Sequence, residues 1–416
     1  MEKYKNKFIS LLHWSEKYTK TDMVYLTKNS FWINANTVIT SIFAFAISIA
    51  FARLLPKDIY GTYQFVISIS AIIGSFTLTG MNTAVTQAVA RGFEKVFPES
   101  VRTQIKFGMI PAILGLGFSL YYILNQNSVL SISLIAVAIL LPIANALNTW
   151  GAFLSGKKEF KDYFKYSQII NIIYYGGTTL VILFLPKALF LILANFILNT
   201  IANFVVYKLI IKKHKPNDNN EEEALSFGKK FSLSNILPMI ALNIDNIVIF
   251  HFLGATNLAI YAFASNIPDR LGGLLRPISM VAFPKLAEQE PSDIKANIFK
   301  KTSLLFVISL AAGLFYILIA PFIFKTFFPF YIESVKYSQL YALAIILGVT
   351  SGLPMIAMYA RRINKVHILN ISYPIISIAM LCFGGYLWGI IGVIFAKIAS
   401  NLLLLGGSLC INKFSD

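Results

Sequence analysis

Residues 55–65 read LPKDIYGTYQF and lie where one long apolar run of the sequence ends and the next begins. Residues 253–263 read LGATNLAIYAF at a corresponding point, 198 residues later. In both stretches a tyrosine follows the leucine by eight residues and a phenylalanine follows it by ten. The sequence therefore predicts that the chain is built from two similar halves joined in series.

The apolar runs on either side of these stretches predict helices that span a membrane, because a span needs about 20 predominantly apolar residues. Twelve such runs occur, six in each half: 30–54, 62–86, 105–124, 129–153, 164–185, 188–211, 230–252, 257–283, 299–324, 335–358, 366–387 and 388–411.

The composition excludes soluble classes of protein. Hydrophobic residues make up 56% of the chain and charged residues only 13%, against roughly 25% charged residues in soluble domains. Nucleic-acid binding, of which a net charge of +17 is otherwise typical, is excluded with them.

The basic residues instead indicate how the chain is oriented in the membrane. With the N-terminus in the cytoplasm, 28 of the 36 lysines and arginines fall in cytoplasmic segments and five in external ones. Positive residues concentrate on the cytoplasmic side of membrane proteins and meet anionic lipid headgroups there. We therefore expect a multi-pass protein of the inner (cytoplasmic) membrane with both termini in the cytoplasm.

The predicted organisation has four parts. Residues 1–28 form a lysine-rich cytoplasmic tail, either an interfacial helix or a loosely ordered segment. Residues 29–213 form the first lobe, 214–224 a polar cytoplasmic linker, and 225–416 the second lobe. An even number of spans per lobe makes the repeat parallel, related by an axis along the membrane normal.

Two longer stretches carry a resemblance to a known family. They are FARLLPKDIYGTYQFVISISAIIGSFTLTGMNTAVTQAVARG (51–92) and NIDNIVIFHFLGATNLAIYAFASNIPDRLGGLLRPISMVAFPKLAE (243–288). On these the chain resembles the polysaccharide (O-antigen-type, Wzx-like) flippase family, within the superfamily of MATE-like drug antiporters and the lipid II flippase.

The resemblance implies a V-shaped pair of six-helix lobes. The central cavity would be lined mainly by spans 1, 2, 7 and 8. The resemblance also implies transport of a polyprenyl-pyrophosphate-linked oligosaccharide by alternating access. Membrane lipids and the polysaccharide polymerase machinery are the candidate partners.

The sequence carries no signature of an enzyme. It has no GxSxG, Walker A or HExxH motif, and no gap between spans is large enough for a soluble catalytic domain. Its two cysteines, Cys382 and Cys410, lie in apolar runs, which excludes a disulfide scaffold and a CxxC metal site. We expect a transporter with no catalytic residues, metal or cofactor.

Five charged residues lie well inside predicted spans, away from the span ends, where a charge costs about 2.5–3.5 kcal/mol on insertion scales. They are Asp245, Asp269, Arg270, Arg276 and Lys397. Arg270 lies near the middle of its span. Asp245 is the one carboxylate placed to take up a coupling H⁺ or Na⁺ near the outer side.

Two interpretations of these charges stay open. Arg270 and Arg276 could bind the pyrophosphate of the substrate, since a guanidinium carries a permanent charge and a fork of donors that matches phosphate oxygens. Alternatively, Asp245 and Asp269 neutralise the arginines in a structural network. Lys397 is expected to be structural.

Amide side chains on the expected cavity helices are the remaining site candidates. Amides suit sugar hydroxyls because they donate and accept hydrogen bonds together, and they also join helices. The candidates are Asn34 and Asn36 in the first span, Asn82 and Gln87 in the second, and Asn243 and Asn246 in the seventh.

Three functions are compatible with the sequence. The first is the lipid-linked oligosaccharide flippase. The second is a cation-coupled antiporter of drugs or small molecules with the same fold, although such a protein would favour an acidic cavity and the charges here are balanced. The third is a membrane-embedded glycan polymerase or a scaffold.

The predicted topology places Asn219 in the cytoplasm and Asn127 outside. A single cysteine introduced at each position should be labelled by a membrane-impermeant maleimide from opposite sides of the membrane. The native cysteines would be replaced by alanine first. Labelling of both positions from outside would contradict the twelve-span topology.

Overall fold

The computed structural model describes residues 23–414 except 288, 362 and 364. Most of the predicted tail, residues 1–22, therefore lies outside the described residues. The described residues form helices and connecting turns, with no strand among them.

The helices begin and end as follows: α2 Met23–Leu54, α3 Lys57–Gly74, α4 Met81–Ala90, α5 Val96–Phe107, α6 Met109–Leu124, α7 Ser128–Leu147, α8 Trp150–Gly156, α9 Phe160–Asn171, η1 Ile172–Gly176, α10 Gly177–Phe184, α11 Ala188–His214, α12 Glu222–Ala287, α13 Pro291–Phe327, η2 Pro329–Tyr331, α14 Ser334–Ala360 and α15 Val366–Phe414.

In the described part of the chain, nine helical segments are long and apolar enough to span a membrane. Two of them, Glu222–Pro277 and Val366–Phe414, have 56 and 49 residues, about twice the length that one crossing needs. Each contains a glycine with a positive φ, Gly254 and Gly389, where the chain reverses direction. Each of these segments is therefore two crossings.

The remaining crossing is α3 with α4. The 18 residues of α3 extend about 27 Å, and the turn at residues 75–80 separates them from α4. The described residues thus contain twelve crossings, as the sequence predicts.

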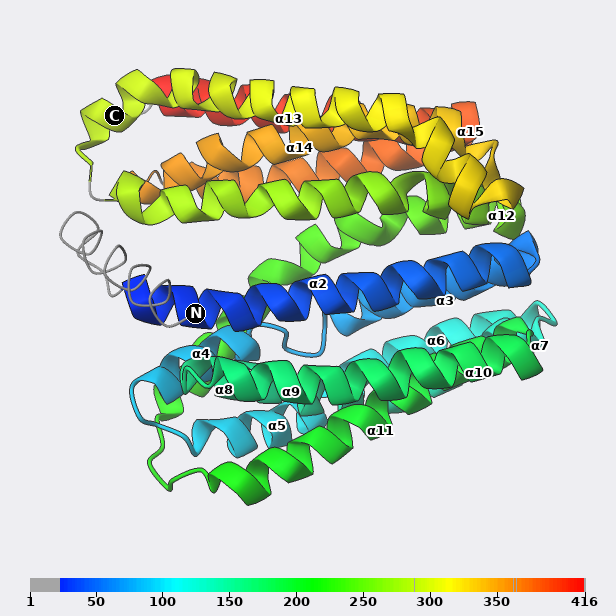
Figure 1. Ribbon diagram of the computed structural model, residues 1–416, viewed down its shortest axis with the longest axis horizontal. Coiled ribbons are helices and arrows are strands. Elements are labelled where there is room, and N and C mark those ends of the chain that lie inside the picture. The colour runs from blue at the N-terminus through cyan, green and yellow to red at the C-terminus, as the bar shows by residue number, and fades with distance from the viewer. Residues whose placement is uncertain (1–22, 288, 362, 364, 415–416) are drawn as a thin grey trace, which may run out of the picture.

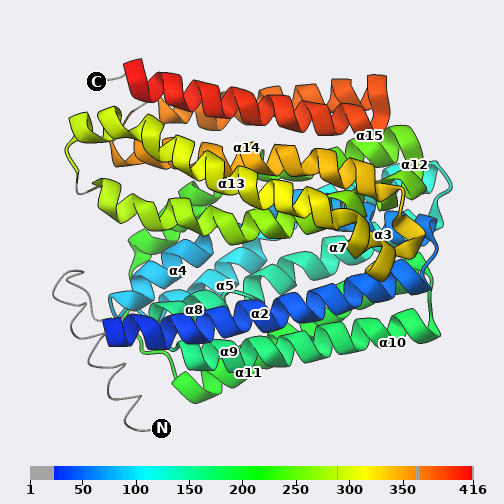
Figure 2. The ribbon, with the colours of Figure 1, turned by 45° about the horizontal axis from the view of Figure 1, so that its top comes forward.

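The crossings form two bundles. Figures 1 and 2 show α12–α15 together as one bundle, while α4–α11 form the other and α2 and α3 lie along its inner face. The described chain begins and ends at the same end of the molecule. We call this the terminal end. The opposite end carries the turns at Pro56, Gly254 and Gly389.

The internal repeat is visible in these turns. Pro56 precedes α3 and Gly254 breaks α12, and the two positions are 198 residues apart, the offset that the sequence motif predicts. At Gly61, next to the first of these turns, a β-carbon would lie 1.8 Å from the carbonyl oxygen of Ala255. Only a glycine allows the two bundles to meet this closely.

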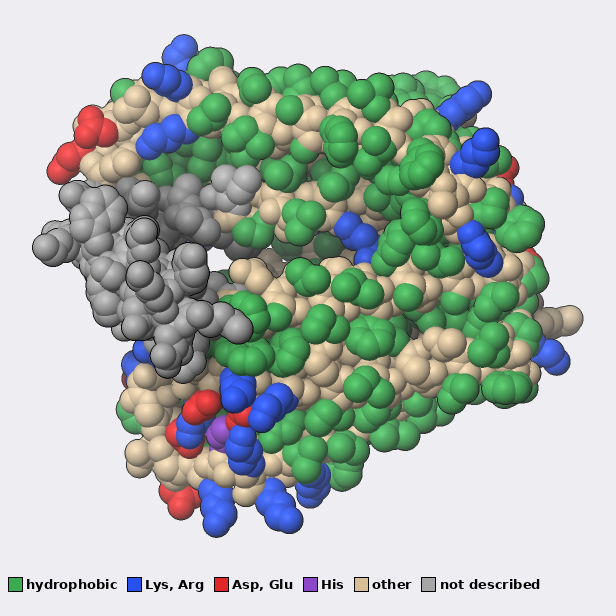
Figure 3. All heavy atoms as spheres, in the orientation of Figure 1, with side chains coloured by type: hydrophobic (Ala, Val, Ile, Leu, Met, Phe, Trp, Pro, Cys, Tyr) green, Lys and Arg blue, Asp and Glu red, His purple; other side chains and the backbone are tan. Residues whose placement is uncertain are grey.

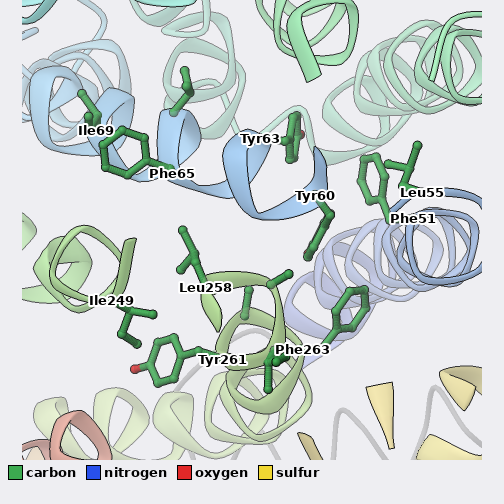
Figure 4. Close-up of a cluster of buried hydrophobic side chains, with 14 of the residues drawn as sticks. Phe51, Leu55, Tyr60, Tyr63, Phe65, Ile69, Ile249, Leu258, Tyr261 and Phe263 are labelled. Carbon is green, nitrogen blue, oxygen red and sulfur yellow. The ribbon is translucent and has the colours of Figure 1, made fainter. Parts of the chain in front are cut away.

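The bundles share a hydrophobic core at the opposite end. Figure 4 shows Phe51 and Tyr60 of the first bundle close to Phe263 of the second, and the rings of Tyr60 and Phe263 have centroids 4.8 Å apart. Nearby, the rings of Phe65 and Phe250 stack with centroids 3.7 Å apart. These contacts close the space between the bundles at this end.

Polar contacts surround this aromatic core. Arg53 donates a hydrogen bond of 2.7 Å to the carbonyl oxygen of Thr326, and Lys57 forms an ion pair with Glu333. Both contacts join the α2–α3 region to the segment around η2. The opposite end is therefore held shut by apolar and polar contacts together.

The terminal end is less tightly closed. Span α12 before Gly254 stays packed on α4 there, with Ser232 Oγ accepting a hydrogen bond of 2.9 Å from the Gly80 amide. Between α2 and α12 after Gly254, however, the molecule is hollowed, and Figure 3 shows basic side chains inside the hollow. The two bundles therefore enclose a space that narrows toward the opposite end.

Candidate functional site

A cavity of about 450 Å³ lies between the bundles. Its walls come from four crossings: α2, α3 and the two parts of α12. Polar side chains line most of it: Thr40, Ser41, Gln64, Asn246, Ser265, Asn266, Asp269 and Arg270. The wall helices are the four that the family resemblance implies, spans 1, 2, 7 and 8.

Arg270 is the cationic group of this cavity. Its Nε donates a 2.9 Å hydrogen bond to the Asn266 amide oxygen, and one terminal nitrogen lies 3.4 Å from the carbonyl oxygen of Ala44 in α2. Both acceptors are neutral. Of the ion pairs among the described residues, none includes Arg270. In the described part of the chain, the guanidinium is thus held by two hydrogen bonds to neutral acceptors and forms no ion pair.

Asp245 does not neutralise Arg270. Its side chain is almost completely buried and forms an ion pair with Lys397 of α15. It also accepts a 2.6 Å hydrogen bond from the Tyr261 hydroxyl. The proposed network in which the two aspartates neutralise the two arginines is therefore wrong for Asp245, whose partner is Lys397.

The same cluster extends to Asp269. Lys397 Nζ donates a 3.0 Å hydrogen bond to the Tyr341 hydroxyl, which lies 3.3 Å from a carboxylate oxygen of Asp269. The Lys397 ammonium also lies 5.1 Å from the centroid of the Tyr341 ring. Asp269 forms no ion pair with Arg276 among the described residues, although the two lie on one helix.

Arg276 lies elsewhere. It lines a second cavity of about 320 Å³ inside the second bundle, together with Asp269, Tyr341, Lys397 and Asn401. This cavity is enclosed by α12, α14 and α15. Asp269 lines both cavities, whereas each arginine lines only one of the two.

The predicted amides are placed differently from one another. Asn82 is exposed and lines two cavities in the first bundle. Asn243 donates to the Met239 carbonyl oxygen of its own helix, and Asn34 is exposed on α2 outside the residues that line the cavities above. Of the three, only Asn82 therefore meets a cavity described here.

Other amides join helices. Asn246 donates a 2.8 Å hydrogen bond to Ser68, linking α12 to α3 across the bundles, and Asn36 accepts one of 2.9 Å from Gln168. Gln64 and Asn266, which line the central cavity, were not singled out from the sequence. The sequence feature that marks both residues is a polar side chain within a span that the family resemblance assigns to the cavity wall.

Comparison with known proteins supports this architecture. A family profile described as "Polysaccharide biosynthesis protein" matches residues 26–290. No curated protein matches the sequence.

Several solved structures are similar in fold. A lipid II flippase MurJ in an inward closed conformation is 15% identical, covers 91% of this chain and 86% of its own, and gives a TM-score of 0.61. An outward-facing multidrug resistance MATE family transporter is 13% identical over 94% of both chains, with a TM-score of 0.60. A MOP superfamily transporter from Pyrococcus furiosus is 13% identical, covers 94% and 96%, and gives 0.53. At these identities the similarity shows the fold.

The ion pair between Asp245 and Lys397 generates a stability prediction. Replacing Lys397 by Met leaves a buried carboxylate without its partner, which should lower the free energy of unfolding by about 3–5 kcal/mol. Asp245→Asn combined with Lys397→Met should recover most of this loss. The melting temperature is measured in detergent, with size-exclusion chromatography as the readout of folded protein. Lys230→Met, which removes an exposed lysine, is the control. A double variant as unstable as the single one would show that the pair does not stabilise the fold.

Proposed function

Because the chain belongs to the polysaccharide biosynthesis protein family, we propose that it is a flippase for a polyprenyl-pyrophosphate-linked oligosaccharide. It carries this lipid from the cytoplasmic to the outer leaflet of the inner membrane by alternating access. The main support is the guanidinium of Arg270, which lines the cavity between the bundles and forms no ion pair with another described residue.

An unpaired guanidinium near the middle of a membrane is costly, about 2.5–3.5 kcal/mol on insertion scales. A bound anionic substrate would compensate this cost, because it would neutralise the guanidinium. A pyrophosphate supplies oxygens that accept charge-assisted hydrogen bonds from guanidinium nitrogens. The two neutral acceptors that hold Arg270 fix its orientation and leave donors available.

The hollow between α2 and α12 after Gly254 supports a lipid substrate in particular. It lies between two apolar membrane helices and leads to the cavity that Arg270 lines. Exposed side chains such as Ile42 and Leu274 lie on these helices. A polyprenyl chain can therefore remain in the lipid while its headgroup occupies the polar cavity.

The closed opposite end supports alternating access. The terminal end carries the lysine-rich segments that the charge distribution places in the cytoplasm. The structure then corresponds to a state open to the cytoplasm, and transport requires the contacts around Tyr60, Phe263, Arg53 and Lys57 to separate. A second state open at the opposite end completes the cycle.

The cation-coupled antiporter is less well supported by the same residues. Asp245, the carboxylate placed to bind a coupling ion, is already paired with the Lys397 ammonium. The Lys397 ammonium thus occupies the place at Asp245 that a coupling cation would need. The flippase is therefore the function that the geometry favours.

Arg270→Gln should reduce the amount of polysaccharide at the cell surface by about 10- to 100-fold. This is the effect of losing one charge-assisted interaction worth about 1.5–3 kcal/mol. Arg270→Lys should retain part of the activity because it keeps a point charge.

Surface polysaccharide and protein abundance in the membrane are measured together, and Arg102→Gln, which removes an exposed arginine from α5, is the matched control. Normal surface polysaccharide in a strain whose only copy carries Arg270→Gln would refute the proposal.

A further inference from the structure

Two cavities of the first bundle are not used by the site described above. One of about 430 Å³ runs along α3 toward α4, and one of about 490 Å³ lies between α4, α8 and α9. Asn82 and Asn148 line both, so the two cavities adjoin each other. In the part of the chain that the structure describes, no charged side chain lines either cavity.

The amides around these cavities fall into two groups. Gln104, Asn145 and Asn195 are held by neighbouring side chains: Gln104 donates to Thr149, Asn145 to Thr77, and Asn195 accepts from Tyr63 and Tyr174. These amides have a structural role in the first bundle.

Asn82, Gln87 and Asn148 differ from them. All three are exposed, and their side-chain amides make no hydrogen bond with another described residue. Each unengaged amide offers two donors and an acceptor. Beside them, Tyr163 is partly exposed and packs on the buried ring of Trp150, with centroids 5.4 Å apart. The lining therefore combines free amides with an aromatic ring.

This combination is the chemistry of a neutral sugar. Each sugar hydroxyl both donates and accepts hydrogen bonds, and a carboxamide offers an NH₂ donor and a carbonyl acceptor to match it. The apolar face of a sugar ring also packs on an aromatic ring. An anion would require a cationic group, and an apolar chain would leave the three amides unsatisfied.

We infer that the amide-lined groove formed by Asn82, Gln87, Asn148 and Tyr163 binds the neutral sugar residues of the glycan, separately from the pyrophosphate at Arg270. The inference rests on the proposed function and assigns the two ends of the substrate headgroup to different bundles. The charged wall belongs to the second bundle and the neutral wall to the first.

The distance between the two sites fits an oligosaccharide. Gln64 lines the central cavity with Arg270, and Asn82 follows it by 18 residues along α3 and α4. The part of α3 from Gln64 to its end at Gly74 alone extends about 15 Å, and the turn at residues 75–80 then leads to α4. The first sugar therefore stays near the pyrophosphate, and the groove is reached only by sugars several positions further along the chain.

The test compares two lipids in proteoliposomes that contain the full-length protein. One is the oligosaccharide-linked polyprenyl pyrophosphate that accumulates in cells lacking this protein, and the other is the same lipid trimmed by exoglycosidases to its first sugar. Transport is measured as accessibility of the sugar to an external lectin. Asn82→Ala with Gln87→Ala removes two free amides, and Asn297→Ala, an exposed amide on α13, is the control.

We expect the double variant to carry the intact lipid about tenfold more slowly, the effect of losing two hydrogen bonds, and the trimmed lipid at the wild-type rate. Arg270→Gln should slow both lipids. An equal loss for both lipids in the double variant, or no loss for either, would overturn the inference while the proposed function stands. If the wild-type protein carries neither lipid, the proposed function fails and the inference fails with it.

Discussion

The ion pair between Asp245 and Lys397 joins two distant crossings and leaves Arg270 without Asp245 as a partner. It joins α12 before Gly254 to α15 after Gly389 and lies between the tyrosines Tyr261 and Tyr341, with Asp245 buried and Lys397 partly buried. If either partner were removed, the remaining charged group would stay buried without a counter-charge. Lys397 is the partner of Asp245, and none of the ion pairs among the described residues joins a carboxylate of this cluster to Arg270. The guanidinium of Arg270 therefore stays available to an anion in the central cavity.

The internal repeat places a related cluster in the first bundle, but without charge. Tyr63 corresponds to Tyr261 at the repeat offset, and its hydroxyl donates to Asn195 instead of a carboxylate. In both clusters a tyrosine hydroxyl donates a hydrogen bond to a buried side chain. The acceptor is a neutral amide in the first bundle and a carboxylate in the second. One bundle can hold a charged group and the other a neutral one, which is the asymmetry that a charged lipid with a sugar chain requires.

Much of the fold could be predicted from the sequence because the membrane imposes a minimum apolar length on each crossing. The twelve apolar runs correspond to the twelve crossings, and the LPKDIYGTYQF stretch marks a real turn at Pro56 that recurs at Gly254. The helices extend beyond the predicted runs at the terminal end, as α2 and α13 do, because helical backbone continues where polar side chains can reach water.

The candidate site was less predictable, because depth along a helix does not determine which face a residue occupies. Lys397 follows Asp245 by 152 residues, and no local pattern indicates that they meet. Asn243 and Asn82 are similar amides in sequence, yet one bonds to its own helix and the other lines a cavity. Such differences depend on how neighbouring crossings rotate against one another, which is set by packing between distant segments.

Lipid binding to the purified protein shows whether Arg270 recognises the pyrophosphate of a membrane lipid. Native mass spectrometry would compare a polyprenyl pyrophosphate with the polyprenol of the same length, for the wild-type protein and for Arg270→Gln. We expect the wild-type protein to retain the pyrophosphate much more strongly than the alcohol, and Arg270→Gln to lose this preference. Equal retention of the two lipids by the wild-type protein, or an unchanged preference in Arg270→Gln, would show that Arg270 does not recognise the pyrophosphate.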